Sequence, residues 1–251
     1  AHSDFFFYTI YNEAERLRQL SHPGIVHLLP IKINSESMRN VPYVANASLP
    51  GRPWFLVLEH LSGGALDDIL NKEKRLPQVL ALRVAQRLAA TLDYIHRCGQ
   101  VHLDIKPENI LFRRELTPDT LPDPVLIDFG IARNVGQEGL EARTLHYSPP
   151  ERVLIHKSGV ALELLAKPAP SMDVYSLGVV LYQMLTGRRP YEGHNDKRIS
   201  SAILNSNPTK PSIYVSDLDR DVEDIVLQAM AKDPAARPTA AWAGSPTCPT
   251  T

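Results

Sequence analysis

The spacing of hydrophobic and polar residues predicts three helices from residue 77 onward. Between Pro77 and Cys98 apolar residues recur three and four positions apart, and Gly99 ends the pattern. The apolar face consists of Ala81, Val84, Ala85, Leu88, Leu92 and Ile95. The segment 171–187 is apolar on almost every side, which predicts a buried central helix with Ser171 as its N-cap. The amphipathic segment 221–233 predicts another helix.

The earlier part of the chain predicts a sheet with one helix. Good helix formers occupy residues 12–20, and Pro23 and Gly24 then stop the helix. The runs 25–33 and 53–59 are rich in β-branched and aromatic residues, which indicates strands. Further on, the short β-like runs "NILF" and "VLIDF" flank the Pro-rich insert 113–124, as in a hairpin. These elements together predict an α+β fold.

Composition excludes several classes of protein. A chain of 251 residues with 43% hydrophobic content can bury a large core, as one domain or as two lobes. Its net charge of -1 gives no reason to expect nucleic acid or an anionic membrane as a partner. The longest apolar run, 174–185, is too short to span a bilayer. Two cysteines, Cys98 and Cys248, favour a reducing compartment, so we expect a cytoplasmic protein.

The candidate chemistry lies in the stretch "VHLDIKPENI", which holds Asp104, Lys106 and Asn109, and in "IDFG", which holds Asp128. Alone, the first stretch fits an ordinary polar turn equally well. With "SPPE" at 148–151 and "DPAARPT" following in order, the set resembles the protein kinase catalytic domain over roughly residues 8–240. The resemblance implies a bilobal fold.

By this resemblance the chain divides into three parts. Residues 1–58 form a partial N-lobe with one helix and the remaining sheet strands, and residues 59–240 form the hinge and a mainly helical C-lobe. Residues 241–251 form a tail that is clipped or disordered. The resemblance also implies ATP and Mg²⁺ as cofactors and proteins as substrates. The lysine in "DIKPEN" implies serine or threonine acceptors.

The resemblance assigns catalytic roles to five residues. Asp104 accepts the proton of the substrate hydroxyl, and Lys106 steadies the γ-phosphate of ATP. Asn109 and Asp128 hold Mg²⁺, a hard ion that prefers oxygen ligands. Thr144 bridges Asp104 and Lys106, although a threonine there also fits a phosphorylation site.

A second group of residues binds adenine by the same resemblance. Leu58 is the gatekeeper, the backbone of Glu59 and Leu61 meets the adenine edge, and Leu111 forms an apolar floor. A strand that leads into a Gly-Gly turn explains this segment equally well without any ligand.

Other matches are architectural. Glu151 and Arg237 occupy the positions of a buried ion pair, and Asp173 matches the aspartate that holds the catalytic turn. An apolar column that links the lobes would contain Leu17, His102 and Phe129.

The glutamate of the first large helix corresponds to Glu13, with Glu15 as the less favoured register. Its lysine partner and the Gly-rich phosphate loop have no match, because the first glycine is Gly24 and the first lysine is Lys32. We therefore expect a fragment of an active kinase whose exposed ends favour self-association. A non-catalytic kinase-like binding module is the alternative. A small-molecule phosphotransferase of the aminoglycoside-kinase type is disfavoured by "DIKPEN", "SPPE" and Arg237.

Leu103 stands where much of the family has an arginine that clamps a phosphate on the activation loop. The segment 131–143 contains no serine, threonine or tyrosine. Our hypothesis is that this kinase is not switched by activation-loop phosphorylation.

Overall fold

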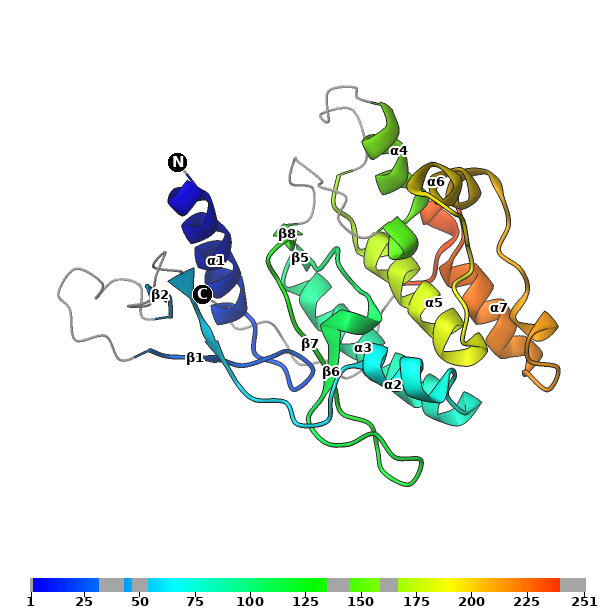
Figure 1. The fold of residues 1–251 in the computed structure, drawn as a ribbon, viewed down its shortest axis with the longest axis horizontal. Helices are drawn as coiled ribbons and strands as arrows, with labels where there is room; N and C mark the ends of the chain where they lie inside the picture. Colours follow the sequence, from blue (N-terminus) through cyan, green and yellow to red (C-terminus); the bar gives the residue numbers. More distant parts are fainter. Residues whose placement is uncertain (1, 32–42, 47–53, 135–144, 159–166, 240–251) are drawn as a thin grey trace.

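The computed structural model describes residues 2–31, 43–46, 54–134, 145–158 and 167–239. Figure 1 shows the long helix α1 beside short strands on one side, and a group of helices on the other. The order along the chain, strands first and most helices later, agrees with the sequence pattern. No described helix is long and apolar enough to cross a membrane.

Helix α1 (His2–Arg18) begins ten residues before the predicted start at residue 12. Its early turns hold aromatic residues, which favour helices only weakly by themselves. Packing explains the longer helix, because the Phe7 ring lies 4.6 Å from the Trp54 ring and stacks on Tyr11 at 5.6 Å. Tertiary contact therefore overrides local preference here.

The predicted strands 25–33 and 53–59 are present but shorter. Strand β1 (Leu28–Leu29) pairs antiparallel with β4 (Val57–Leu58), and β2 (Ala45–Asn46) pairs with β3 (Trp54–Phe55). Residues just before β1 pair elsewhere: the Val26 N–H donates to the Leu126 carbonyl at 3.1 Å, and the Leu126 N–H donates to the Gly24 carbonyl at 2.8 Å. These bonds join the small part of the molecule, which holds α1 and β1–β4, to the large part, which holds β7 and most of the helices.

The predicted hairpin around the Pro-rich insert is confirmed. Strand β6 (Ile110–Phe112) pairs antiparallel with β7 (Pro124–Leu126), and Figure 1 shows the long loop between them reaching away from the helices. A second short pair joins β5 (Gln100–Val101) to β8 (Arg133–Asn134). The catalytic-turn candidates lie between β5 and β6.

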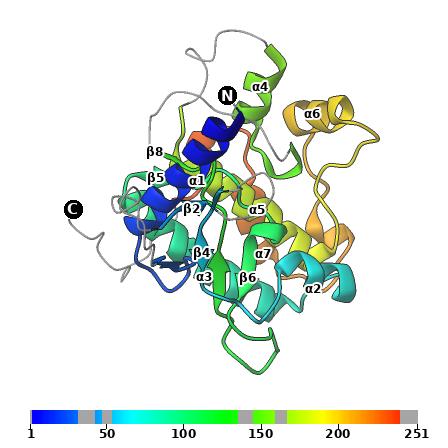
Figure 2. The same cartoon turned by 60° about the vertical axis from the view of Figure 1, so that its left-hand side comes forward.

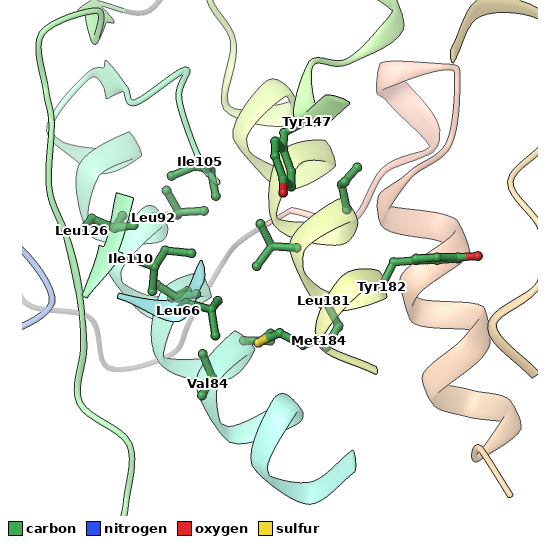
Figure 3. Packing of buried hydrophobic residues seen from close by; sticks show 14 of the residues in the cluster. Leu66, Val84, Leu92, Ile105, Ile110, Leu126, Tyr147, Leu181, Tyr182 and Met184 are labelled. Atoms are coloured by element: carbon green, nitrogen blue, oxygen red, sulfur yellow. The ribbon is translucent and has the colours of Figure 1, made fainter. Parts of the chain in front are cut away.

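The large part is built around helix α5 (Pro170–Thr186), which packs between α3 (Gln78–Arg97) and α7 (Arg220–Ala229). Figure 2 shows α5 behind α1, with α3 and α7 close to it. Every residue of the predicted apolar face of α3 is buried, and Figure 3 shows Val84 from that face near Met184 of α5, while Leu92 lies near Ile105. This interface forms the main core.

Two helix ends differ from the prediction. Ser171 is not the N-cap of α5, because the helix begins at Pro170 and Ala169 occupies the cap without a side-chain bond. Proline at the first helical position needs no hydrogen bond for its missing N–H, which sets the earlier start. Helix α7 stops at Ala229, and Asp233 then caps the short helix η6 (Pro234–Ala236). Gly187 ends α5 at the end of the predicted segment 171–187, and its backbone is left-handed.

The remaining elements surround this core. They are α2 (Leu66–Glu73), η2 (Pro107–Asn109), η3 (Leu145–Tyr147), α4 (Pro150–Ser158), α6 (Asp196–Asn205) and η5 (Pro211–Ile213). Cys98 is the C-cap residue of α3. Cys248 and the predicted tail lie outside the described residues.

Candidate active site

The turn between β5 and β6 brings three predicted residues together. The Lys106 Nζ lies 2.7 Å from the Asp104 Oδ2, and both side chains are largely buried. The Asn109 amide donates to the backbone carbonyl and to the Oδ2 of Asp104, each at 2.9 Å. Pro107 opens η2 at its first position, which fixes the turn that carries Asn109. The Asp104 carboxylate is therefore held in one orientation by two residues that follow it.

His102, two residues before Asp104, is buried and neutral. The Asp104 N–H donates to the His102 Nδ1 at 3.3 Å, so the ring proton lies on Nε2, which faces the Ile127 carbonyl at 3.1 Å. Burial lowers the pKa of His102 below its ordinary value. The ring also packs edge-on against Phe129 at 4.6 Å. His102 therefore supports the turn by packing and hydrogen bonding.

Asp173, in the first turn of α5, holds the backbone ahead of Asp104. Its carboxylate accepts the N–H of His102 at 2.9 Å and the N–H of Leu103 at 2.8 Å. His96 of α3 lies 2.8 Å from the same carboxylate. Burial by itself raises the pKa of Asp173, but the His96 hydrogen bond and charge outweigh it and the pKa lies below the ordinary value. A single buried charge thus connects α5, α3 and the catalytic turn.

Leu103 packs in an apolar cluster instead of facing a phosphate. Its side chain is buried with Val101, Ile131 and Met172, apart from the main core. Its φ of 68° is left-handed, a strained conformation for a residue that is not glycine. The buried Arg152 donates to the Leu103 carbonyl. Hydrogen bonds to the N–H and to the carbonyl of Leu103, together with the packing of its side chain, therefore keep the backbone in this strained conformation.

Asp128 lies two residues after β7, next to the catalytic turn. The Ile127 N–H donates to the Asn109 carbonyl at 3.1 Å, which places Asp128 beside the residue predicted to share its metal. Asp128 has a left-handed φ of 61°, and its Oδ1 accepts the Gly130 N–H at 3.2 Å. The Asn109 Nδ2 donates to Asp104, so the Oδ1 of Asn109 is left to bind a metal ion. Amide and carboxylate oxygens are the ligands that Mg²⁺ prefers, so the residues present fit this ion.

Glu13, not Glu15, reaches this site from α1. The Phe129 N–H donates to the Glu13 Oε1 at 3.3 Å. Glu15 instead pairs with Arg18 at 2.7 Å on the outer face of the helix. Burial and the nearby Asp128 charge raise the pKa of Glu13 to about 7. The favoured register therefore places a carboxyl group against the backbone that follows Asp128.

The predicted adenine-binding segment follows β4. The Glu59 N–H donates to the His27 carbonyl at 2.9 Å, and the Glu59 carboxylate accepts the His27 N–H at 2.8 Å and a bond from Arg113. Burial raises the pKa of Glu59, but the hydrogen bonds from Arg113 and His27 outweigh it and the pKa lies below the ordinary value. The side chain and the N–H of Glu59 are thus bonded within the chain, and among the described residues its backbone carbonyl is left for a ligand.

The other two adenine-binding candidates follow the same connection. Leu61 is buried, and Leu111 in β6 is half-buried and bridges to Ala65. Among the described residues, the Leu61 N–H makes no hydrogen bond within the chain. Leu58, the gatekeeper candidate, lies in β4 opposite Leu28. These positions are compatible with an adenine site.

The predicted ion pair between Glu151 and Arg237 is present. The Arg237 guanidinium has no exposed side-chain surface and donates to both carboxylate oxygens of Glu151, at 2.7 and 2.8 Å. It also donates to the Ser171 carbonyl at 3.0 Å and lies 5.0 Å from the Tyr175 ring. The pair fixes the start of α4 to the start of α5.

Sequence reasoning missed three residues that support the site. His96 contacts the Asp173 carboxylate, Arg113 donates to the Glu59 carboxylate, and Arg152 donates to the Leu103 carbonyl. Only the tertiary structure brings these partners together, and none belongs to a motif. Thr144 lies outside the described residues.

Comparison with known proteins identifies the family. The model of the protein kinase domain matches residues 3–245, so the chain belongs to this family. The expected α+β kinase fold, with a partial N-lobe and a mainly helical C-lobe, is thereby confirmed.

The curated relatives are bacterial. A protein of Corynebacterium efficiens named serine/threonine-protein kinases drp72 is 38% identical over 188 residues, which cover 73% of this chain and 32% of that protein. Serine/threonine-protein kinases PknA of Corynebacterium glutamicum is 36% identical over 188 residues, or 73% of this chain and 36% of PknA. Serine/threonine-protein kinase PknB of Mycobacterium tuberculosis is 28% identical over 237 residues, or 91% of this chain and 33% of PknB. The chain therefore spans about a third of the length of these relatives.

Proposed function

We propose that this domain transfers the γ-phosphate of ATP to serine or threonine hydroxyls of proteins. The observation that carries the proposal is the fixed orientation of the Asp104 carboxylate by Lys106 and Asn109 beside Asp128. A structural turn has no need for two carboxylates, a lysine and an amide in one partly buried place, since each costs desolvation energy.

In this proposal each group has one task. Asp104 orients the acceptor hydroxyl and takes its proton, while Lys106, already paired with Asp104, turns toward the transferred phosphoryl group. Asn109 and Asp128 would hold Mg²⁺. ATP would supply the phosphoryl group, and the metal ion would neutralise the charge on its phosphates. The backbone of Glu59 and Leu61, with Leu58 and Leu111, would bind adenine. Thr144 keeps its proposed bridging role as a prediction.

The alternative, a non-catalytic binding module, is less favoured. The relatives are named as kinases, and the three polar residues that phosphoryl transfer needs converge in this chain.

The test is phosphate transfer from radiolabelled ATP to a serine-containing protein such as casein. We expect Asp104→Asn to lose at least about 100-fold in rate, whereas the exposed Asp217→Asn retains the rate. Nucleotide binding, measured with a fluorescent ATP analogue, should survive in Asp104→Asn. Equal rates in the two variants would contradict the assigned role of Asp104.

We further propose a cytoplasmic location, because ATP and magnesium are supplied there. Self-association through exposed apolar ends also stays a prediction, which sedimentation equilibrium of the chain would test.

A further inference from the structure

A polar groove lies at the C-terminal end of α5. Three segments line it: the connection between α2 and α3, the short helix η3, and the turn that follows α5. Its volume is about 810 Å³. Its charged and ring-bearing lining consists of Glu73, Lys74, Arg75, His146, Arg188, Arg189, Tyr191 and Glu192. We call it the cationic groove.

The backbone of the groove is fixed. The Leu76 N–H donates to the Met184 carbonyl at 2.7 Å, which attaches the α2–α3 connection to α5. Gly187 has a φ of 71°, and a Cβ at that position would lie 2.7 Å from the Lys74 carbonyl oxygen. Only glycine permits this approach without a shift. The groove is therefore formed before any ligand arrives.

The charges of the groove are not balanced internally. Four cationic side chains line it against two carboxylates, and Glu73 already lies 3.3 Å from Lys72 outside the groove. Within the described ranges, no carboxylate lies at ion-pair distance from the guanidinium of Arg75, Arg188 or Arg189. An anion that entered would meet cations whose charge is not yet neutralised.

Aromatic rings orient two of these arginines. Arg188 lies over the Tyr214 ring at 5.0 Å, and Arg189 lies over the Tyr147 ring at 5.8 Å. A guanidinium that stacks on a ring keeps the N–H groups at its edge available for a carboxylate or phosphate. The stacked pairs thus restrict the side chains without consuming their charge.

The groove adjoins the catalytic turn through α2. Helix α2, whose last residue Glu73 lines the groove, packs against η2, and η2 begins three residues past Asp104. In η3, the Tyr147 hydroxyl donates to the Oε1 of Gln183, which lines the groove, at 2.7 Å. A polypeptide with its serine at Asp104 can therefore extend along α2 to the groove.

We propose that the cationic groove binds an acidic segment of the protein substrate, through carboxylate or phosphate groups, and so selects which hydroxyl is presented to Asp104. This inference rests on the proposed kinase function and adds a substrate class to it. Arg188 and Arg189 are the specificity-determining residues, and Arg75 adds a third guanidinium from the connection between α2 and α3.

The test measures binding without ATP, so that it does not depend on catalysis. The probes are fluorescein-labelled peptides with one serine and a run of glutamates on its N- or C-terminal side. Matched peptides carry phosphoserine, glutamine or lysine in place of glutamate. We expect glutamate or phosphoserine peptides to bind about tenfold tighter than the glutamine peptide, and their relative affinities identify the preferred anion.

The decisive variant is Arg188→Ala with Arg189→Ala, and Arg75→Ala tests the contribution of the α2–α3 connection. The control is Arg83→Ala with Arg87→Ala, two exposed arginines of α3 that do not line the groove, so the net charge of both double variants is equal. We expect acidic-peptide binding to weaken about tenfold only in the groove variants. Circular dichroism verifies that each variant is folded.

Asp104→Asn should bind the acidic peptides as the unchanged chain does, which separates this inference from the proposed catalysis. Equal affinity for glutamate and glutamine peptides would overturn the proposal. Equal losses in the groove and control variants would do so as well. A single-stranded oligonucleotide that binds as tightly as the acidic peptides would overturn the assignment to protein substrates.

Discussion

The Asp173 carboxylate accepts the Leu103 N–H at 2.8 Å, although 70 residues separate the two along the chain. Through this bond the buried helix α5 sets the backbone of the residue immediately before Asp104. The position of the proposed base is therefore decided in the core of the large part, and not by the turn alone.

Asp173→Ala should destabilise the chain by about 3–5 kcal/mol, because it leaves buried donors and the His96 ring without their acceptor. Asp173→Asn keeps one acceptor oxygen and should lose less. Urea unfolding followed by circular dichroism measures both. A loss below about 1 kcal/mol in the alanine variant would show that the buried carboxylate is not needed for stability.

Arg237→Ala should destabilise the chain by about 3–5 kcal/mol, since Glu151 would remain partly buried without its partner. Removing both charges, as Arg237→Met with Glu151→Leu, should cost less than the single change. A guanidinium chloride unfolding series gives the coupling energy of the pair. The exposed Arg220→Ala serves as the control and should stay within about 0.5 kcal/mol of the unchanged chain.

Leu103→Ala should cost about 2–5 kcal/mol, because it opens a cavity among Val101, Ile131 and Met172. Leu121→Ala, which removes a side chain that is 63% exposed, should have little effect. Thermal unfolding compares the two.

The same burial of Leu103 supports the hypothesis that activation-loop phosphorylation is not the switch. We expect mass spectrometry of the active protein to find no stimulatory phosphate on Thr144. A phosphate there that raises the transfer rate would refute the hypothesis.

Asn109→Ala removes both amide bonds to Asp104 and should reduce kcat at least about 100-fold. The KM for the protein substrate should change little, because Asn109 is proposed to act on the orientation of Asp104 and on Mg²⁺. Steady-state transfer assays with varied substrate separate the two constants. Asn71→Ala, which loses only a surface bond to Asp67, should keep normal kinetics.

Because the pKa of Glu13 is raised in the folded chain, the free energy of unfolding should fall as pH rises. Its pKa lies at about 7 in the folded chain against 4.5 in the unfolded chain, so between these values the folded chain holds a proton that the unfolded chain releases. The favourable contribution is complete below 4.5 and is lost as pH rises through 7.

Against Glu13→Gln, the unchanged chain should therefore lose about 1–3 kcal/mol of relative stability between the acidic and alkaline sides of this window. Urea unfolding in EDTA at several pH values measures the difference. A pH-independent difference between the two proteins would contradict the raised pKa of Glu13.

The sequence predicted the features that depend on local pattern. The apolar spacing of α3, the Gly187 stop of α5 and the β6–β7 hairpin follow from periodicity and turn residues, and each is present. The convergence of Asp104 and Asn109 follows from their short spacing within one turn.

Features that depend on distant contacts could not be predicted. The early turns of α1 form because Trp54 packs on Phe7, and the strand expected from residue 25 is short because Val26 bonds to Leu126. The bond from Arg113 to the Glu59 carboxylate joins residues 54 positions apart, and no local pattern indicates it. In each case a partner remote in the chain decides the outcome.

The bond between Glu59 and Arg113 has a consequence for motion. Arg113 also donates to the Pro23 carbonyl at 2.9 Å, so one guanidinium joins the connection before β1, the segment after β4 and the end of β6. These three pieces should therefore move as one body with the large part. Any opening of the nucleotide side would have to bend the chain beyond them, and α1 with the short strands would then move relative to this body.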